Sequence, residues 1–291
     1  MKIAIYGQIY HHNSEASITK LLDELKNSSA NVLIESEFYG ILNSQIKLKE
    51  SYQTFTGLDG TFDLLISIGG DGTMLRSVTF VRDLNIPIIG INTGRLGFLA
   101  TIQVDQIEEA VRDIITGNYS ISERSLLCIH TVPKNEQFSE LNFALNEIAV
   151  SRKNTTSMIT VETTLDEEYL TSYWADGLIV STPTGSTGYS LSCGGPVIMP
   201  EAESLVLTPI APHNLNARPL VISNHTKIKL RVSGREDTFL VSLDSRIATL
   251  DNDTTIHIEK APFKVKMIEL KHESFLNTIR KKLLWGEDKR N

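Results

Sequence analysis

The sequence predicts two folded domains, an α/β domain followed by a β-rich domain. The chain has 291 residues, which at roughly 150 residues per domain corresponds to two domains. Strand and helix patterns alternate in the first part of the chain, as in a doubly wound α/β fold. After Tyr119, short strand-like runs follow one another with few helical patterns between them, which favours a β-sandwich-like domain. We therefore expect a first domain of residues 1–118 with a returning segment 271–291, and a second domain of residues 119–270.

The elements of the first domain follow from hydrophobic spacing. Apolar runs bounded by turn residues predict strands at 3–6, 31–35, 62–68 and 86–91. Apolar residues at helical spacing predict helices at 14–25, 74–81 and 105–117. Asp105 and Glu108 resemble a capping box at the start of the last helix, and Gly117 is placed to end it. The run 62–68 is almost continuously apolar, as is typical of a parallel strand covered on both faces.

The second domain is predicted from short apolar or alternating runs. These runs are 126–132, 143–150, 158–165, 177–181, 227–232, 238–243, 255–259 and 263–270. Phe275, Ile279 and Leu283 then lie at helical spacing, which predicts a last amphipathic helix packing on the first domain.

Composition excludes several classes of protein. The 28 Lys and Arg residues against 35 Asp and Glu residues give a net charge of −7, so no overall positive field favours a nucleic acid. No signal peptide and no run of about 18 to 20 apolar residues is present, so we expect no membrane partner and a cytoplasmic location. Cys128 and Cys193 form no CxxC pair and suit a reducing compartment. The histidines show no metal-ligand spacing, His11 and His12 are interpreted as a solvated pair, and zinc is not expected.

The most informative motif is Gly69-Gly70-Asp71-Gly72-Thr73, which directly follows the predicted strand 62–68. Glycines let backbone N–H groups approach phosphate oxygens, and a helix N-terminus reinforces such an anion site. Asp71 is placed to touch a substrate hydroxyl or a metal ion. The alternative is a tight turn without a ligand, in which the Asp71 side chain makes only a local turn bond. No Walker lysine, GxGxxG fingerprint or GxSxG elbow is present.

A second glycine-rich stretch, residues 92–99, follows the next predicted strand, so its loop is expected at the same carboxyl edge of the sheet. Arg95 is suited to pair with a phosphate and Phe98 to stack on a base. A solvated arginine and a core phenylalanine are the alternative reading. Two such loops at one edge are able to form a single crevice.

Two further stretches carry polar groups in unusual places. The stretch 175–190 is an apolar strand that leads into a loop dense in hydroxyls and glycine, and the loop continues to Gly194-Gly195-Pro196. A flexible loop without a ligand is the alternative for such a composition. Hydroxyls and exposed amides suit the recognition of sugars, bases and phosphates. Asn146 and Glu147 interrupt the apolar run 143–150, and a buried glutamate needs a partner within the protein or on a ligand.

Together these stretches resemble the NAD kinase family, in the same order and over most of the chain. The Gly-Gly-Asp-Gly motif alone is shared with phosphofructokinases and with diacylglycerol and sphingosine kinases, whereas the four stretches together are specific. The resemblance implies an α/β domain of the phosphofructokinase and diacylglycerol kinase type, a β-rich NAD-binding domain, and phosphoryl transfer to the 2'-hydroxyl of the adenosine ribose of NAD, which gives NADP.

The resemblance also assigns roles to residues. Asp71 is the expected catalytic carboxylate, a group that aligns the hydroxyl and accepts its proton late, because phosphoryl transfer relies on positioning and charge neutralisation more than on a strong base. The residues expected to bind NAD are Asp71, Gly72, Phe98, Asn146, Glu147, Asp176, Thr187, Tyr189, Ser192 and Asp244. The residues expected to bind the phosphate donor are Gly69, Gly70, Gly72, Thr73 and Arg95. Gly188 stands where the family usually has alanine, and Asp244-Ser245 where it commonly has Asp-Gly.

The resemblance further implies ATP or polyphosphate as donor and a homodimer or homotetramer. Mg²⁺ or another divalent cation is expected to be held mainly by the substrate phosphates, with no dedicated protein ligands. Two other functions stay open from the residues alone. One is a lipid kinase of the diacylglycerol type, because it shares the glycine motif, and the other is a catalytically silent NAD(H) or NADP(H) sensor, because of Gly188 and Ser245. The four stretches are expected to meet around one dinucleotide.

Overall fold

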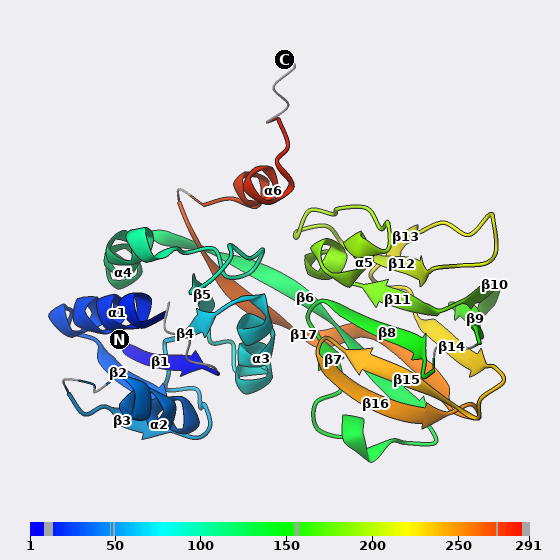
Figure 1. Cartoon of the computed structure of the whole chain (residues 1–291), viewed down its shortest axis with the longest axis horizontal. Helices are drawn as coiled ribbons and strands as arrows, with labels where there is room; N and C mark the ends of the chain where they lie inside the picture. Colours follow the sequence, from blue (N-terminus) through cyan, green and yellow to red (C-terminus); the bar gives the residue numbers. More distant parts are fainter. Residues whose placement is uncertain (9–13, 47, 49, 155–156, 272, 287–291) are drawn as a thin grey trace. The chain divides into compact units, whose positions relative to one another are not determined.

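The chain forms two compact units in a computed structural model (Figure 1). The structure describes residues 1–8, 14–46, 48, 50–154, 157–271 and 273–286, so the prediction for His11 and His12 lies outside the described residues. The first unit consists of residues 1–123 and 265–291, and the second of residues 124–264. Both boundaries fall inside long strands, β6 (Tyr119–Val132) and β17 (Thr255–Leu270), and not at the predicted limits 118/119 and 270/271.

The first unit is a parallel sheet covered by helices. Its strands lie in the order β5-β4-β1-β2-β3, and the last part of β17 pairs with β5. The strands are β1 (Lys2–Gly7), β2 (Asn31–Glu35), β3 (Gln53–Phe55), β4 (Leu64–Gly69) and β5 (Ile88–Asn92). The helices are α1 (Glu15–Asn27), α2 (Ser36–Gln45), α3 (Asp71–Val81), η2 (Val104–Gln106), α4 (Ile107–Thr116) and α6 (Phe275–Leu283). Helices α1 and α4 pack together over one face of the sheet, where Leu21, Ile66 and Ile114 belong to one apolar core.

The second unit is a sandwich of two sheets. One is a six-stranded antiparallel sheet in the order β13-β12-β11-β8-β15-β16, and the other contains β10, β9, β14 and β17 in that order with β6 and β7 beside them. The strands not yet given are β7 (Phe143–Ala144), β8 (Glu147–Arg152), β9 (Ile159–Leu165), β10 (Glu168–Ala175), β11 (Gly177–Ser181), β12 (Ser204–Ile210), β13 (Leu220–Ser223), β14 (Ile228–Ser233), β15 (Thr238–Leu243) and β16 (Arg246–Asp251). Three single turns of helix are η3 (Glu136–Phe138), η4 (Thr184–Thr187) and α5 (Tyr189–Ser192).

The inner faces of the two sheets form one core. Val150, Val180 and Val241 from the first sheet share it with Val161 and Leu230 from the second. The predicted fold class, a doubly wound α/β domain with a β-sandwich-like domain, is therefore confirmed. Among the described residues, no helix combines the length and the apolar character that crossing a membrane requires.

Three sequence expectations about elements differ from the structure. The capping box lies two residues earlier than expected, because Gln103 and Gln106 exchange the bonds and a 3-10 turn precedes α4. The runs 255–259 and 263–270 form the single strand β17. The run 143–150 is broken into β7 and β8, and the break falls at Leu145 and Asn146, where contacts within the candidate site hold the backbone.

Candidate active site

The Gly-Gly-Asp-Gly motif forms the junction between β4 and α3 in the first unit. Gly69 ends β4, Gly70 is the N-cap of α3, and Asp71 is the first residue of that helix. Gly69 pairs with Asn92 at the end of β5, so the loops that follow the two strands leave the same edge of the sheet. The N-terminal N–H groups of α3 therefore face this edge, which is the usual ligand edge of a parallel sheet.

The side chain of Asp71 holds the second glycine-rich loop. Its Oδ1 accepts the backbone N–H groups of Leu99 at 2.9 Å and Ala100 at 3.0 Å, and its Oδ2 accepts that of Phe98 at 2.8 Å. A Cβ atom at Gly97 would lie 1.9 Å from Asp71 Oδ1, so only glycine permits this close approach. The motif carboxylate is thus fixed by the loop, and one lone pair of Oδ2 is left for a further donor.

Other contacts shape the loop that carries Arg95 and Phe98. Asn92 donates from Nδ2 to the Arg95 carbonyl at 2.8 Å, and its Oδ1 accepts the N–H of Gly94 at 2.8 Å. Lys282 of α6 donates from Nζ to the Leu96 carbonyl, and its Nζ lies 5.3 Å from the centre of the Phe98 ring. Arg95 is exposed and Phe98 is half-buried, so both side chains are open to a ligand.

Two of the glycines expected to bind the phosphate donor, Gly70 and Gly72, are not required by packing. A Cβ atom at Gly70 or Gly72 would meet nothing within 4 Å, so the fold itself has no steric need for glycine there. Both positions are exposed at the N-terminus of α3, and Thr73 is half-buried in its first turn. Absence of side chains at this point leaves room for a bound group close to the helix N–H groups.

A cavity of about 420 Å³ adjoins the ends of β1 and β2. Helix α3 contributes Arg76, Thr79 and Phe80 to its wall, and Gln8 and Ser36 line it from the strand ends. Arg76 is one helical turn beyond the glycine motif and supplies a positive charge, a feature that sequence reasoning missed because it lies outside the glycine-rich stretches.

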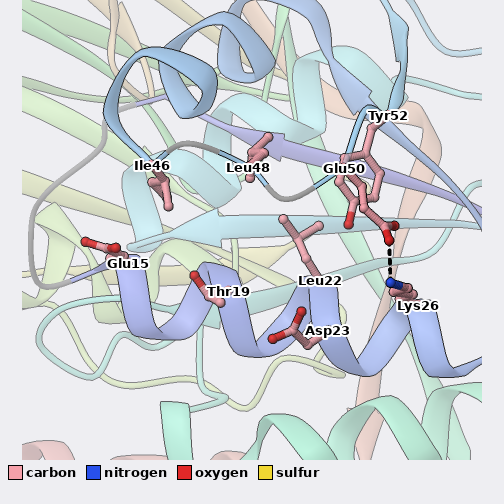
Figure 2. Close-up of a pocket in the computed structure, with 9 residues that line it drawn as sticks. All are labelled: Glu15, Thr19, Leu22, Asp23, Lys26, Ile46, Leu48, Glu50 and Tyr52. Atoms are coloured by element: carbon pink, nitrogen blue, oxygen red, sulfur yellow. Dashed lines mark hydrogen bonds and ion pairs between the residues drawn. The ribbon is translucent and has the colours of Figure 1, made fainter.

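A second cavity of the first unit, of about 210 Å³, lies between α1 and the residues Ile46, Leu48, Glu50 and Tyr52 (Figure 2). Figure 2 shows Lys26 paired with Glu50 beside the apolar side chains of Leu22 and Leu48. None of the motif residues lines this cavity, so it is not part of the candidate site.

In the second unit, Asn146 and Glu147 lie at the break between β7 and β8. The Asp244 carboxylate accepts the N–H groups of Leu145 at 3.0 Å, Asn146 at 2.8 Å and Glu147 at 3.2 Å. These bonds turn the backbone out of the strand, which explains why the predicted run 143–150 is interrupted. Both side chains lie close to Gly188, where a Cβ atom would be 3.1 Å from Glu147 Oε2 and 3.5 Å from Asn146 Nδ2.

The pair presents two buried oxygen atoms that no group in the described part of the chain satisfies. Among the described residues, Asn146 Oδ1 and Glu147 Oε2 are buried and have no hydrogen-bond partner. Burial, and secondarily the charge of Asp244, raises the pKa of Glu147 to about 8. Burial likewise raises the pKa of Asp244, against the lowering effect of its three N–H donors. Buried polar atoms normally have partners, so these two oxygens mark a place for ligand donors.

The hydroxyl-rich loop packs against this pair. Thr182 Oγ1 donates to the Leu145 carbonyl at 2.6 Å, and a Cβ atom at Gly185 would lie 2.1 Å from the Asn146 carbonyl oxygen. Gly188 has room for a Cβ atom only at 3.1 Å from Glu147 Oε2, so the alanine usual in the family would press on this carboxyl. The turn of Asp244 and Ser245 has a positive φ only at Asp244, 52°, so it does not require glycine at 245.

The remaining residues expected to bind NAD lie in or near this loop, and they differ in how far their side chains are exposed to solvent. Tyr189 and Ser192 are exposed on α5, and Thr187 donates to the Thr184 carbonyl at 3.2 Å. Asp176 forms an ion pair of 2.9 Å with Arg152. Burial first, and then the nearby Cys193, Asp176 and Glu147, raises the pKa of Tyr189, so these groups lie within electrostatic reach of the phenol.

The fold and these two clusters define a class of protein, a phosphotransferase that acts on nucleotides. A glycine turn at a helix N-terminus suits phosphates, and the second unit offers a polar, hydroxyl-lined binding surface. Two family descriptions match the chain: the N-terminal domain of ATP-NAD kinase over residues 3–119 and the C-terminal domain of ATP-NAD kinase over residues 145–270. The chain belongs to the NAD kinase family.

Curated relatives align with this chain over their full length. The NAD kinases of Christiangramia forsetii and Bacteroides fragilis are 62% and 40% identical, each over 100% of both chains. A solved NAD kinase from Archaeoglobus fulgidus in complex with ATP superposes with a TM-score of 0.74 at 27% identity, over 97% of each chain. Yeast NADH kinase complexed with NADH shares the fold, with a TM-score of 0.83 at 23% identity over 98% of this chain and 88% of that one. Membership of the NAD kinase family excludes the lipid-kinase alternative, and the chain is a phosphotransferase, so the silent-sensor alternative is not retained either.

Proposed function

We propose that the chain transfers the terminal phosphoryl group of ATP to the 2'-hydroxyl of the adenosine ribose of NAD, which gives NADP. The observation that carries this proposal is the β4–α3 junction, where two exposed glycines with no steric reason to be glycine adjoin a carboxylate fixed by three N–H groups. Phosphate oxygens are expected on the N–H groups of residues 70–72 and on the hydroxyl of Thr73, whose own N–H donates to the Gly70 carbonyl at 3.0 Å. Arg76 and the cavity at the ends of β1 and β2 are expected to receive the nucleoside side of the donor.

Asp71 is proposed to orient the accepting hydroxyl. Three N–H groups fix its carboxylate, and Oδ2 has one lone pair free to accept the hydroxyl hydrogen. As the new P–O bond forms and the bond from the terminal phosphorus to ADP breaks, the hydroxyl proton passes to Oδ2. This is the late proton acceptance that a loose phosphoryl-transfer transition state requires.

The second unit is proposed to bind the dinucleotide. The unsatisfied oxygens of Asn146 and Glu147 are suited to accept bonds from ribose hydroxyls or the adenine amine. Tyr189, Thr187 and Ser192 offer hydroxyls on the neighbouring loop. Asp244 is proposed to act through its hold on residues 145–147, and Asp176, paired with Arg152, is proposed for the nicotinamide side. That the four stretches meet around one dinucleotide stays a prediction.

The chemistry of the donor set suits a divalent cation held mainly by phosphates. The Asp71 oxygens already accept three N–H bonds, so this carboxylate offers at most one position to a metal. Mg²⁺ accepts such an arrangement, because it keeps several waters and binds few protein ligands. When bound, the ion offsets the charge of the donor phosphates.

We also propose a homodimer or homotetramer in the cytoplasm. Several apolar side chains of the second unit are exposed, among them Trp174 at 48%, Val221 at 49% and Ile247 at 66%, and an association of copies would cover such groups. Light scattering on the purified chain tests the assembly state.

One coupled assay tests the reaction. NAD is incubated with ATP or polyphosphate, with and without Mg²⁺, and the product is reduced by a dehydrogenase specific for NADP. We expect reduction only with donor and divalent cation present. A phosphorylated product that this dehydrogenase does not accept would contradict the 2' position, and absence of any product would contradict the proposal as a whole.

A further inference from the structure

A cluster of three metal-ligating side chains lies in the second unit, outside the candidate active site. Cys128 and His130 are two residues apart on β6, so their side chains lie on the same face of the strand. Glu259 comes from β17, the strand with which β6 pairs. The Sγ, imidazole and carboxylate atoms of these residues all lie within 4.8 Å of one another.

The spacing of the three groups is close to that of ligands around one ion. His130 Nε2 lies 4.0 Å from Cys128 Sγ and 3.8 Å from Glu259 Oε1. The imidazole–carboxylate separation exceeds hydrogen-bond distance, and the thiol contact is at its limit. Ligand bonds of 2.0 to 2.3 Å in a tetrahedral zinc site place neighbouring ligand atoms about 3.3 to 3.6 Å apart. The two distances from His130 Nε2 need to shorten by about half an ångström, and the third separation, between Cys128 Sγ and the Glu259 carboxylate, is at most 4.8 Å.

The donor set also selects the metal. Thiolate, imidazole and carboxylate together suit Zn²⁺, whereas Mg²⁺ and Ca²⁺ prefer oxygen ligands alone. Cys128 is buried, and the side chains of His130 and Glu259 are 58% and 41% exposed, so an ion has access from solvent. The thiol proton of Cys128 is released to solvent when the metal–sulfur bond forms, because the thiolate is the form that binds the metal.

We propose that Cys128, His130 and Glu259 form a zinc-binding site with water as the fourth ligand, which links β6 to β17 within the second unit. The site is independent of the phosphotransferase chemistry, since none of its residues belongs to the motifs of the candidate active site. Zinc was not expected from the sequence patterns, because only the fold brings Glu259 to the Cys-x-His pair.

The test uses the full-length protein, freed of metal and titrated with Co²⁺ alone and then with Zn²⁺ alone. We expect one Co²⁺ per chain, a near-ultraviolet charge-transfer band from thiolate to cobalt, and its loss when Zn²⁺ displaces the cobalt. The chain has 2 cysteines, so retention of the band in Cys193→Ser assigns it to Cys128 without any change at the site. Loss of the band in that variant, or no band in the native chain, would overturn the proposal.

Further variants identify the other ligands. Glu259→Gln and His130→Ala are expected to weaken Co²⁺ binding by at least about tenfold, by removal of one ligand each. His257→Ala is the matched control, because His257 lies two residues before Glu259 on β17 and is not in the cluster. Binding that is unchanged in both ligand variants, or weakened equally in the control, would contradict the assignment.

Discussion

At the scale of single residues, two aspartates do the same structural work. Asp71 accepts the N–H groups of three consecutive residues, 98 to 100, and Asp244 accepts those of residues 145 to 147. In each case a carboxylate satisfies a stretch of backbone that has left regular structure, and that stretch carries a predicted binding residue. Substitution of either aspartate should therefore change both local stability and ligand binding.

Replacement of Asp71 should reduce catalysis much more than it reduces the stability of the fold. In Asp71→Asn, an amide NH₂ faces backbone N–H groups, so the variant loses at least one bond and the free lone pair of Oδ2. We expect kcat to fall by at least about 100-fold and the free energy of unfolding by about 1 to 3 kcal/mol. Activity assays and urea denaturation measure the two changes. Asp83→Asn, at an exposed position after α3, is the control. An active Asp71→Asn enzyme would remove Asp71 from the chemistry.

The carboxyl of Glu147 should make stability depend on pH. Its pKa is raised from 4.5 to about 8, so between these values the unfolded chain releases the proton while the folded chain keeps it. Stability from this group is therefore full at low pH and is lost as the pH rises from about 4.5 to about 8. Glu147→Gln should flatten this slope in urea denaturation at several pH values, and the exposed Glu140→Gln should not. Equal slopes in all three proteins would contradict the burial of an ionisable carboxyl here.

At the scale of elements, sequence patterns predicted most of the first unit. Strand β2 was predicted over its whole length, and the strong periodicity of α4 predicted that helix together with its end at Gly117. Helix α2 and strand β10 were missed. Helix α2 has only Phe38 and Leu42 buried, and β10 has only Tyr173 and Ala175 buried, so neither has the apolar pattern on which the prediction depends.

Replacement by alanine should change the stability of the fold in opposite directions at Gly97, in the loop after β5, and at Gly72, in α3. Gly97→Ala places a Cβ atom against Asp71 Oδ1, so we expect the free energy of unfolding to fall by about 1 to 3 kcal/mol. Gly72→Ala adds a Cβ atom in open space within α3, so we expect stability to hold or rise by up to about 1 kcal/mol. The KM for ATP should nevertheless rise about tenfold in Gly72→Ala, because the methyl group occupies space meant for phosphate. An unchanged KM would show that the donor does not approach this turn.

At the scale of the whole molecule, sequence patterns predicted which stretches bind ligands, but not which distant residues contact those stretches. Arg95 and Phe98 were predicted from their loop, whereas Lys282 was not, because its partner Leu96 lies 186 positions away in the chain. The same limit applies to Glu259, which reaches Cys128 and His130 only through the pairing of β6 and β17. Local patterns report on burial and on turns, and contacts between distant segments require the fold.

The contact of Lys282 gives the C-terminal helix α6 a measurable role. Lys282→Met keeps most of the side-chain length beside the Phe98 ring but removes the charge and the bond to the Leu96 carbonyl. The loop that carries Phe98 should then be less well fixed, and we expect the KM for NAD to rise about three- to fivefold, as for one exposed charge-assisted hydrogen bond. Steady-state kinetics measure this change, and thermal unfolding should be nearly unaffected.

Lys281→Met provides the matched comparison, since Lys281 is exposed on the same turn of α6. It removes an equal charge from the molecule without touching the loop, so any general electrostatic effect on a negatively charged substrate appears in both variants. A rise in KM confined to Lys282→Met assigns the effect to the loop contact. Equal rises in both variants would show instead that the basic last turn of α6 acts only through its charge.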